Sequence, residues 1–153
     1  MNSSEEIIYL QTEGMAKYPT CLLEHFRNPR NVGEILNPDG VGTACNGLCG
    51  DIMQLFIRCD ANKISEVTFR AFGCGAAIAA SSILTERIKG YTVDEAMKIS
   101  EGISEEILSQ LPEEKIPCFK LAANALRLAI EEYRDKQFDA PSKKELEKDR
   151  HKR

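Results

Sequence analysis

The chain has 153 residues, of which 42% are hydrophobic and 29% charged, and its formal net charge is −4. This length and hydrophobic content predict a single compact domain with its own core. The acidic balance gives no basic footprint for nucleic acid, and no apolar run approaches the roughly 18 residues of a membrane span. With no signal-peptide pattern either, we expect a cytoplasmic protein that partners neither nucleic acid nor membranes.

The first forty residues predict one short helix between two irregular segments. Residues 1–17 are mostly polar and are expected to form a loose N-terminal arm. A helix is predicted over 20–27, because Thr20 can cap it and the residue before Pro29 avoids the helical region. Residues 28–40 are rich in turn formers, which predicts a long surface connection.

Two alternating runs predict an antiparallel hairpin. Residues 51–59 and 64–72 each alternate apolar and polar side chains, with a turn at 60–62 between them. An antiparallel hairpin returns the chain to its starting edge. The residues that flank it, Cys49 and Cys74, are therefore expected to lie close together.

A helical period begins after Gly75 and ends at Gly90. Cys74 would then lie at a helix N-terminus, where exposed N–H groups and the helix dipole favour a thiolate. A thiolate is the form that binds metal or attacks sulfur.

The second half of the chain predicts two short helices and one long one. A capping box at Thr92 predicts a helix over 92–99, and a second is expected over 104–111, ended by Pro112. A strongly amphipathic helix then begins at Pro117.

This last helix carries Cys118 in its first turn and is followed by a charged segment. The segment 137–153 has little apolar content and is expected to be a frayed extension or a disordered tail.

Three of the six cysteines lie in glycine-rich or turn-like settings: Cys49, Cys74 and Cys118. In a reducing compartment such cysteines are more often metal ligands or reactive thiols than disulfides. Asp51 follows Cys49 by two positions and adds a carboxylate. Soft thiolate ligands suit zinc and iron–sulfur clusters, so this group predicts a metal site.

The other candidate ligands have simpler explanations. Cys21 and Cys59 accompany apolar residues and are interpreted as small buried hydrophobic side chains. His25 is interpreted as a structural or surface histidine rather than a ligand.

Five ordered blocks of residues resemble one family, the IscU-type iron–sulfur cluster assembly scaffolds, also found as the N-terminal domain of NifU. The resemblance covers residues 18–136. The blocks are Glu24-His25-Phe26 with Asn28-Pro29-Arg30-Asn31-Val32-Gly33, Cys49-Gly50-Asp51, Phe72-Gly73-Cys74-Gly75, Thr85-Glu86 with Lys89-Gly90, and Lys115-Ile116 before Cys118.

This resemblance implies a small α+β fold, with an antiparallel sheet of about three strands and several helices packed on it. It implies a non-catalytic scaffold on which iron and desulfurase-derived sulfur form a [2Fe–2S] cluster for transfer to acceptor or carrier proteins. The implied partners are therefore a cysteine desulfurase and those acceptors. The implied ligands are Cys49, Asp51, Cys74 and Cys118, with Cys118 also accepting the persulfide sulfur on a mobile, accessible loop.

The chain departs from the family pattern at two places. The histidine that usually precedes the third cysteine is replaced by Pro117, and Cys45 offers a thiol that the pattern does not require. Cys45 is either a further metal ligand or a small apolar residue packed at the entry of the loop. The Leu-Pro-Pro-Val-Lys segment of family members served by an Hsp70-type chaperone is only partly matched by residues 111–115.

Two alternatives to the scaffold use the same ligands. Because thiolates and carboxylates also bind Zn²⁺, the apo site could hold zinc. The protein would then be a zinc-bound persulfide relay, that is, a sulfurtransferase, or a structural zinc module. The spacing of the three cysteines leaves no room for the insertion that marks the zinc-dependent SufU sulfurtransferases.

Overall fold

The computed structural model describes residues 20–47, 50–109, 113 and 116–151. The predicted arm, residues 1–17, therefore lies outside the described part of the chain. The elements, in chain order, are α2 (Thr20–Arg27), β1 (Gly40–Asn46), β2 (Asp51–Asp60), β3 (Lys63–Phe72), α3 (Gly75–Ile88), α4 (Val93–Leu108) and α5 (Ile116–His151).

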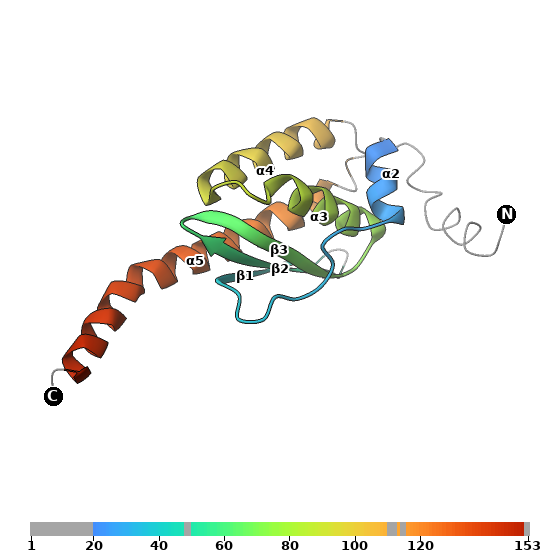
Figure 1. The fold of residues 1–153 in the computed structure, drawn as a ribbon. Helices are drawn as coiled ribbons and strands as arrows, with labels where there is room; N and C mark the ends of the chain where they lie inside the picture. The colour runs from blue at the N-terminus through green and yellow to red at the C-terminus, as the bar shows by residue number, and fades with distance from the viewer. Residues whose placement is uncertain (1–19, 48–49, 110–112, 114–115, 152–153) are drawn as a thin grey trace.

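The three strands form one antiparallel sheet in the order β1-β2-β3. Helices α3 and α5 pack on one face of this sheet, α4 packs on both of them, and α2 packs on α3 (Figure 1). The predicted α+β class with a three-stranded antiparallel sheet is confirmed. Among the described helices, none is both long and apolar enough to cross a membrane.

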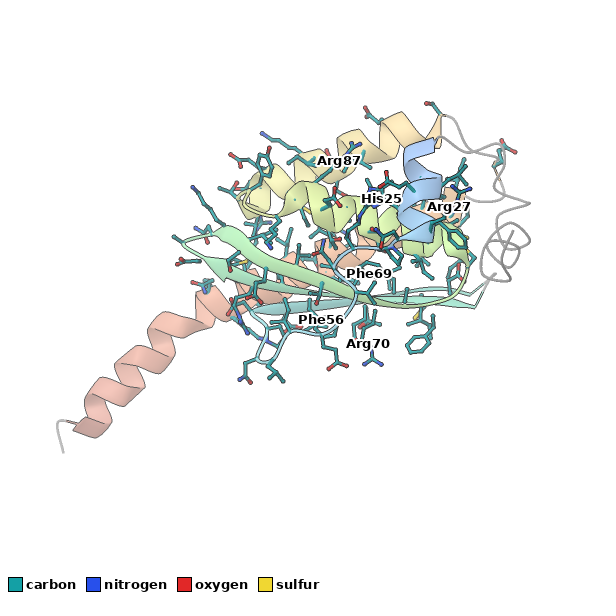
Figure 2. The ribbon with its side chains drawn as sticks, turned by 45° about the vertical axis from the view of Figure 1, so that its right-hand side comes forward. His25, Arg27, Phe56, Phe69, Arg70 and Arg87 are labelled. Atoms are coloured by element: carbon teal, nitrogen blue, oxygen red, sulfur yellow. The ribbon has the colours of Figure 1, made fainter. Side chains whose placement is uncertain are left out.

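The sheet has an inner face that packs against the helices and an outer face. Met53, Leu55 and Ile57 of β2 are fully buried on the inner face. Phe69 of β3 points the same way, whereas Phe56 and Arg70 point to the opposite face (Figure 2). This alternation along the strands agrees with the predicted hairpin.

Strand β1 was not predicted as a strand, because its inward positions are Gly40, Gly42 and Ala44 rather than large apolar residues. Small residues are needed there because the α5 backbone lies directly on β1. A Cβ added to Gly42 would lie 1.9 Å from the carbonyl oxygen of Ala125. This close contact fixes α5, and with it Cys118, relative to the sheet.

Helix α4 replaces the two predicted helices, 92–99 and 104–111, by one. The predicted capping box is confirmed: the Thr92 N–H donates to Glu95 Oε2 at 3.1 Å, and the Glu95 N–H donates to Thr92 Oγ1 at 3.2 Å. The helix continues through residue 104 because one buried stripe runs unbroken along it. Its members are Val93, Ala96, Ser100 and Ile103.

Helix α5 extends to His151, well beyond Lys136, where the sequence predicts a frayed or disordered tail. Its last turns project from the body of the protein (Figure 1), and Phe138 is 84% exposed. The Lys, Glu and Arg residues of this segment are good helix formers, although Pro141 has no backbone N–H and removes one hydrogen bond from the helix.

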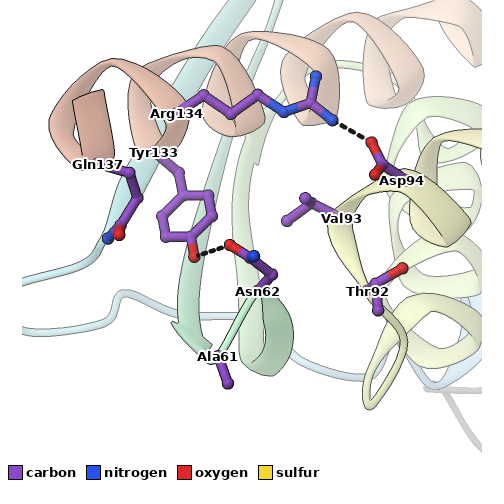
Figure 3. Close-up of a pocket in the computed structure, with 8 residues that line it drawn as sticks. All are labelled: Ala61, Asn62, Thr92, Val93, Asp94, Tyr133, Arg134 and Gln137. Atoms are coloured by element: carbon purple, nitrogen blue, oxygen red, sulfur yellow. Dashed lines mark hydrogen bonds and ion pairs between the residues drawn. The ribbon is translucent and has the colours of Figure 1, made fainter.

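The hairpin turn at Ala61 and Asn62 lies at the end of the sheet opposite Asp51. Tyr133 donates its hydroxyl to Asn62 Oδ1 at 2.7 Å, and the Val93 N–H donates to the Asn62 carbonyl at 3.0 Å. These two hydrogen bonds anchor the hairpin to both α4 and α5. A pocket of about 410 Å³ lies beside this turn (Figure 3).

Candidate metal centre

Asp51, Cys74 and Cys118 meet at one end of the sheet. One ligand atom from each of them lies within 4.8 Å of the others. Asp51 begins β2, Cys74 follows β3, and Cys118 lies in the first turn of α5. The hairpin returns the end of β3 to the start of β2, as predicted, which brings Cys74 to Asp51, and α5 adds Cys118. The residue that the sequence predicted beside Cys74 was Cys49. Cys49 lies outside the described residues.

The Asp51 carboxylate is buried, with 3% of the residue exposed, and lies at the N-terminus of α3. Its Oδ1 accepts the backbone N–H of Cys74 at 3.1 Å, and its Oδ2 accepts the Cys74 thiol at 3.4 Å. Cys74 is the N-cap residue of α3, and its own side chain forms no capping hydrogen bond. A carboxylate from strand β2 therefore accepts a hydrogen bond from an N–H at the start of helix α3, which no residue within the helix can accept.

Gly73 makes this arrangement possible. Its φ of +157° is a conformation that residues with a side chain rarely adopt, and an added Cβ would lie 2.1 Å from Asp51 Oδ1. The glycine before Cys74 therefore provides the space that the carboxylate occupies.

Cys118 is fully buried, because α5 begins at Ile116 and the first turn already faces the core. The next residues that share this burial are Phe119, Leu121 and Ala122. Cys118 lies in the first turn of the helix, as predicted, but the prediction of an accessible thiol is wrong. The preceding residue, Pro117, is exposed.

Cys45 lies in β1 rather than in a loop, and the strand register directs it away from the group. It pairs with Ile52, which directly follows Asp51 and therefore points to the opposite face. Cys45 is exposed there, so it does not pack as a small apolar residue either. Within the described residues, the structure does not bring Cys45 to the three ligands.

The remaining candidates lie away from the three ligands. Cys59 is half-buried in β2, and burial together with the nearby Asp39 carboxylate raises the pKa of its thiol to about 11. His25 Nδ1 lies 2.7 Å from Ser82 Oγ, which agrees with a structural role. Its pKa is lowered by burial and by the Arg30 guanidinium. The side chain of Cys21 lies outside the described residues.

The three groups fit a thiophilic metal. Two thiolates bound to one zinc ion at ~2.3 Å each lie about 3.8 Å apart, so a group spanning at most 4.8 Å needs only a small contraction. Two sulfurs and one oxygen leave a tetrahedral ion one ligand short. Cys49, the further ligand that the resemblance implies, precedes Asp51 by two positions in the sequence.

Sequence reasoning missed the parts that hold the ligands in place. The groups that contact Gly73 and Ser82, namely the Asp51 carboxylate and the His25 imidazole, lie far from them in the sequence. The local signal in the sequence was the glycine on each side of Cys74. Glycines beside a ligand indicate close approach by another group, but the sequence does not identify that group.

The fold and the group together define a small α+β domain that brings two thiols and a carboxylate together, an arrangement suited to a metal ion. Residues 17–140 match the sequence model of the family described as NifU-like N terminal domain. The chain belongs to this family.

Curated relatives carry related names. Iron-sulfur cluster assembly scaffold protein IscU 1 of Archaeoglobus fulgidus is 47% identical over 129 residues, which cover 84% of this chain and 84% of that protein. The scaffold protein IscU of Haemophilus influenzae is 44% identical over 125 residues, covering 78% of this chain and 98% of its own. A relative in Drosophila melanogaster, 43% identical over 133 residues, is named an iron-sulfur cluster assembly enzyme IscU and is covered over 85% of its length, with 84% of this chain.

Solved structures share the fold. A nitrogen-fixing NifU-like protein (N-terminal) from Brucella abortus superposes with a TM-score of 0.66 at 19% identity, covering 77% of this chain and 94% of its own. FiSufU from Fervidobacterium islandicum gives a TM-score of 0.64 at 24% identity, covering 74% of this chain and 96% of its own. These likenesses support the α+β architecture and nothing beyond it.

Proposed function

We propose that this protein is a scaffold on which an iron–sulfur cluster is assembled and from which the cluster passes to acceptor proteins. The observation that carries the proposal is the group of Asp51, Cys74 and Cys118, whose ligand atoms lie within 4.8 Å of one another; Asp51 and Cys118 are buried and Cys74 is half-buried. Relatives that are 44–47% identical and named as iron–sulfur cluster assembly scaffolds support it. The scaffold is not a catalyst in its own right.

The cargo is a [2Fe–2S] cluster held by Cys49, Cys74, Cys118 and Asp51. Thiolates are the usual ligands of cluster iron, whereas a carboxylate oxygen is a poorer match and leaves more readily. Asp51 also has another partner within reach, because its Oδ1 accepts the Cys74 N–H at 3.1 Å. Because the Asp51 carboxylate can return to the helix N-terminus when it leaves iron, it suits a cluster that must be released.

Sulfur enters on Cys118. The Cys118 thiolate attacks the outer sulfur of a persulfide on a cysteine desulfurase; a new S–S bond forms at Cys118, the desulfurase S–S bond breaks, and the desulfurase leaves as a thiolate. Because Cys118 is fully buried, the first turn of α5 must open for this transfer. An opening of this kind is the step at which a desulfurase partner would act.

The proposed partners are a cysteine desulfurase and the proteins that accept or carry the cluster, with an Hsp70-type chaperone as a further candidate. The proposed compartment is the cytoplasm. Zinc is the expected occupant of the site when no cluster is present, because the same two thiols and carboxylate suit Zn²⁺.

Anaerobic reconstitution tests the proposal. Apo-protein is first incubated with cysteine and a catalytic amount of a cysteine desulfurase, and ferrous iron and a thiol reductant are then added, because reduction of the transferred sulfur to sulfide needs more electrons than the iron supplies. The visible spectrum and the bound iron and sulfide are followed. We expect the absorption of a [2Fe–2S] cluster with two iron and two sulfide ions, and its loss in Cys74→Ser.

The same experiment separates the alternatives. A persulfide relay would gain sulfur without iron, and mass spectrometry would find that sulfur on a cysteine. A structural zinc module would bind no cluster and would unfold when zinc is removed by a chelator. Mass spectrometry before iron is added should place the sulfur on Cys118, and Cys118→Ser should abolish assembly.

A further inference from the structure

The ring of Phe26 lies directly against Gly75, the first residue of α3. A Cβ added to Gly75 would lie 1.9 Å from Phe26 Cε2, 2.4 Å from Cδ2 and 2.9 Å from Cζ. One edge of the ring therefore fills the space that any side chain at position 75 would need. Phe26 belongs to α2, a helix that contributes none of the proposed ligands.

Helix α2 and the residues after it are held at a fixed position along α3. His25 Nδ1 lies 2.7 Å from Ser82 Oγ, and the Arg30 N–H donates to the same hydroxyl at 2.8 Å. The Asn31 amide donates to Thr85 Oγ1 at 3.2 Å. Figure 2 shows His25 where α2 meets α3. These contacts to the middle of α3 hold the Phe26 ring at its start.

Cys74 therefore lies between two glycines whose missing side chains are each replaced by a distant group. The Asp51 carboxylate occupies the space beside Gly73, and the Phe26 ring occupies the space beside Gly75. The backbone of Cys74 is held from both sides, by a ligand on one and by an aromatic ring on the other.

We infer that Phe26 is a positioning residue for the metal centre, an inference that rests on the proposed function. Its ring fixes the first turn of α3 and so fixes the direction of the Cys74 thiol. Because coupling between two sites is reciprocal, a metal bound at Cys74 must also strengthen the docking of α2 on α3. The docking of α2 through the Phe26 ring is thus coupled to the occupancy of the site.

Cobalt binding tests this role with a readout that overall stability does not move. Apo-protein is titrated anaerobically with Co²⁺, and the thiolate-to-cobalt charge-transfer band is followed at a temperature where every variant is folded. For Phe26→Ala we expect about tenfold weaker binding, the usual lower limit when an outer partner of a metal ligand is lost, with an altered band. Phe26→Tyr keeps the ring and should bind as the parent does.

Leu23→Ala is the matched control, because Leu23 is another partly buried apolar residue of α2 that packs on the core. It should lower stability and leave the cobalt affinity unchanged. Gly75→Ala adds a double-mutant test. The added methyl group clashes with the ring in the parent and has room in Phe26→Ala, so the two losses of affinity should combine to less than their product.

Hydrogen exchange on the unmodified chain keeps the test decisive even where a variant fails to fold. Zn²⁺ should slow amide exchange in residues 20–27, although none of them is a ligand. Unchanged exchange, or a Phe26→Ala variant with parental cobalt affinity and spectrum, would overturn the role of Phe26 alone. A parent protein that binds neither ion would overturn the proposed metal site as well.

Discussion

Cys74 donates both its backbone N–H and its thiol to the carboxylate of Asp51, at 3.1 and 3.4 Å. Asp51 lies at the start of β2 and Cys74 at the start of α3, so one carboxylate joins the end of the central strand to a helix N-terminus. The same oxygens lie among the proposed metal ligands. Asp51 therefore caps the helix, and under the proposed function it is also a weak ligand.

Replacing Asp51 with Ala should separate these two functions. Loss of the cap should lower the free energy of unfolding of the apo-protein by about 1 kcal/mol, the usual effect of removing a capping side chain. Loss of the labile ligand should lengthen the lifetime of an assembled cluster and slow its transfer to an acceptor. Urea unfolding and the decay of cluster absorption measure the two effects. Faster release from Asp51→Ala than from the parent would contradict the ligand role.

Gly73→Ala should displace the Asp51 carboxylate without removing it. The added Cβ would lie 2.1 Å from Oδ1, and a φ of +157° strains any residue that has a side chain, so we expect a cost of about 1–3 kcal/mol. Metal affinity should fall as well, because the oxygen leaves its place beside Cys74. Gly47→Ala is the matched control, since nothing lies within 4 Å of an added Cβ there. Equal behaviour of the two variants would show that Gly73 does not position the carboxylate.

Acidification should weaken the docking of α2 through His25. Burial, and then Arg30, lower the pKa of His25 from its ordinary value of 6.5, although Glu86 and Glu24 oppose this in part. The unfolded chain therefore takes up a proton at a higher pH than the folded chain does. This contribution to stability is complete above about pH 6.5 and is lost as the pH falls below that value.

Urea unfolding at pH 7.5 and 5.5 measures this loss. His25→Asn replaces the imidazole by a group that does not titrate and can still contact Ser82, so it should show a smaller fall in stability between the two pH values. An equal fall in parent and variant would assign the pH dependence to other groups.

Cys45 and Cys59 should differ strongly in their reaction with iodoacetamide. Cys45 is exposed on the outer face of the sheet, whereas Cys59 is half-buried and the pKa of its thiol is raised to about 11. At pH 8 only about one Cys59 side chain in a thousand is then a thiolate. Peptide mass spectrometry over time should find Cys45 modified first, and the two rates should converge in urea. Rapid modification of Cys59 in the folded protein would contradict its assigned environment.

Cys45→Ser should leave the metal centre unchanged. Its partner Ile52 and the adjacent ligand Asp51 point to opposite faces of β2, so the Cys45 thiol lies on the face away from the ligands. The cluster spectrum, the iron content and the transfer rate should match those of the parent. A shifted spectrum or a shorter cluster lifetime would make Cys45 a ligand after all. Cys74→Ser, assayed alongside, should lose the cluster.

The sequence by itself determined the local elements of this protein. Helix α2, the β2–β3 hairpin and the start of α3 at Cys74 follow from hydrophobic period, turn residues and caps, which act between neighbours in the chain. The meeting of Cys74 with the start of β2 also followed, because an antiparallel hairpin has only one way to return. Five motif blocks sufficed to suggest the family to which the chain belongs.

Only the tertiary structure decided what surrounds each thiol. The burial of Cys118 depends on how closely α5 lies on the glycines of β1, and the outward direction of Cys45 depends on its pairing with Ile52. A shift of that register by one residue would turn the thiol to the other face. Register and close packing are fixed by contacts between residues far apart in the chain, and for this reason local patterns could not assign them.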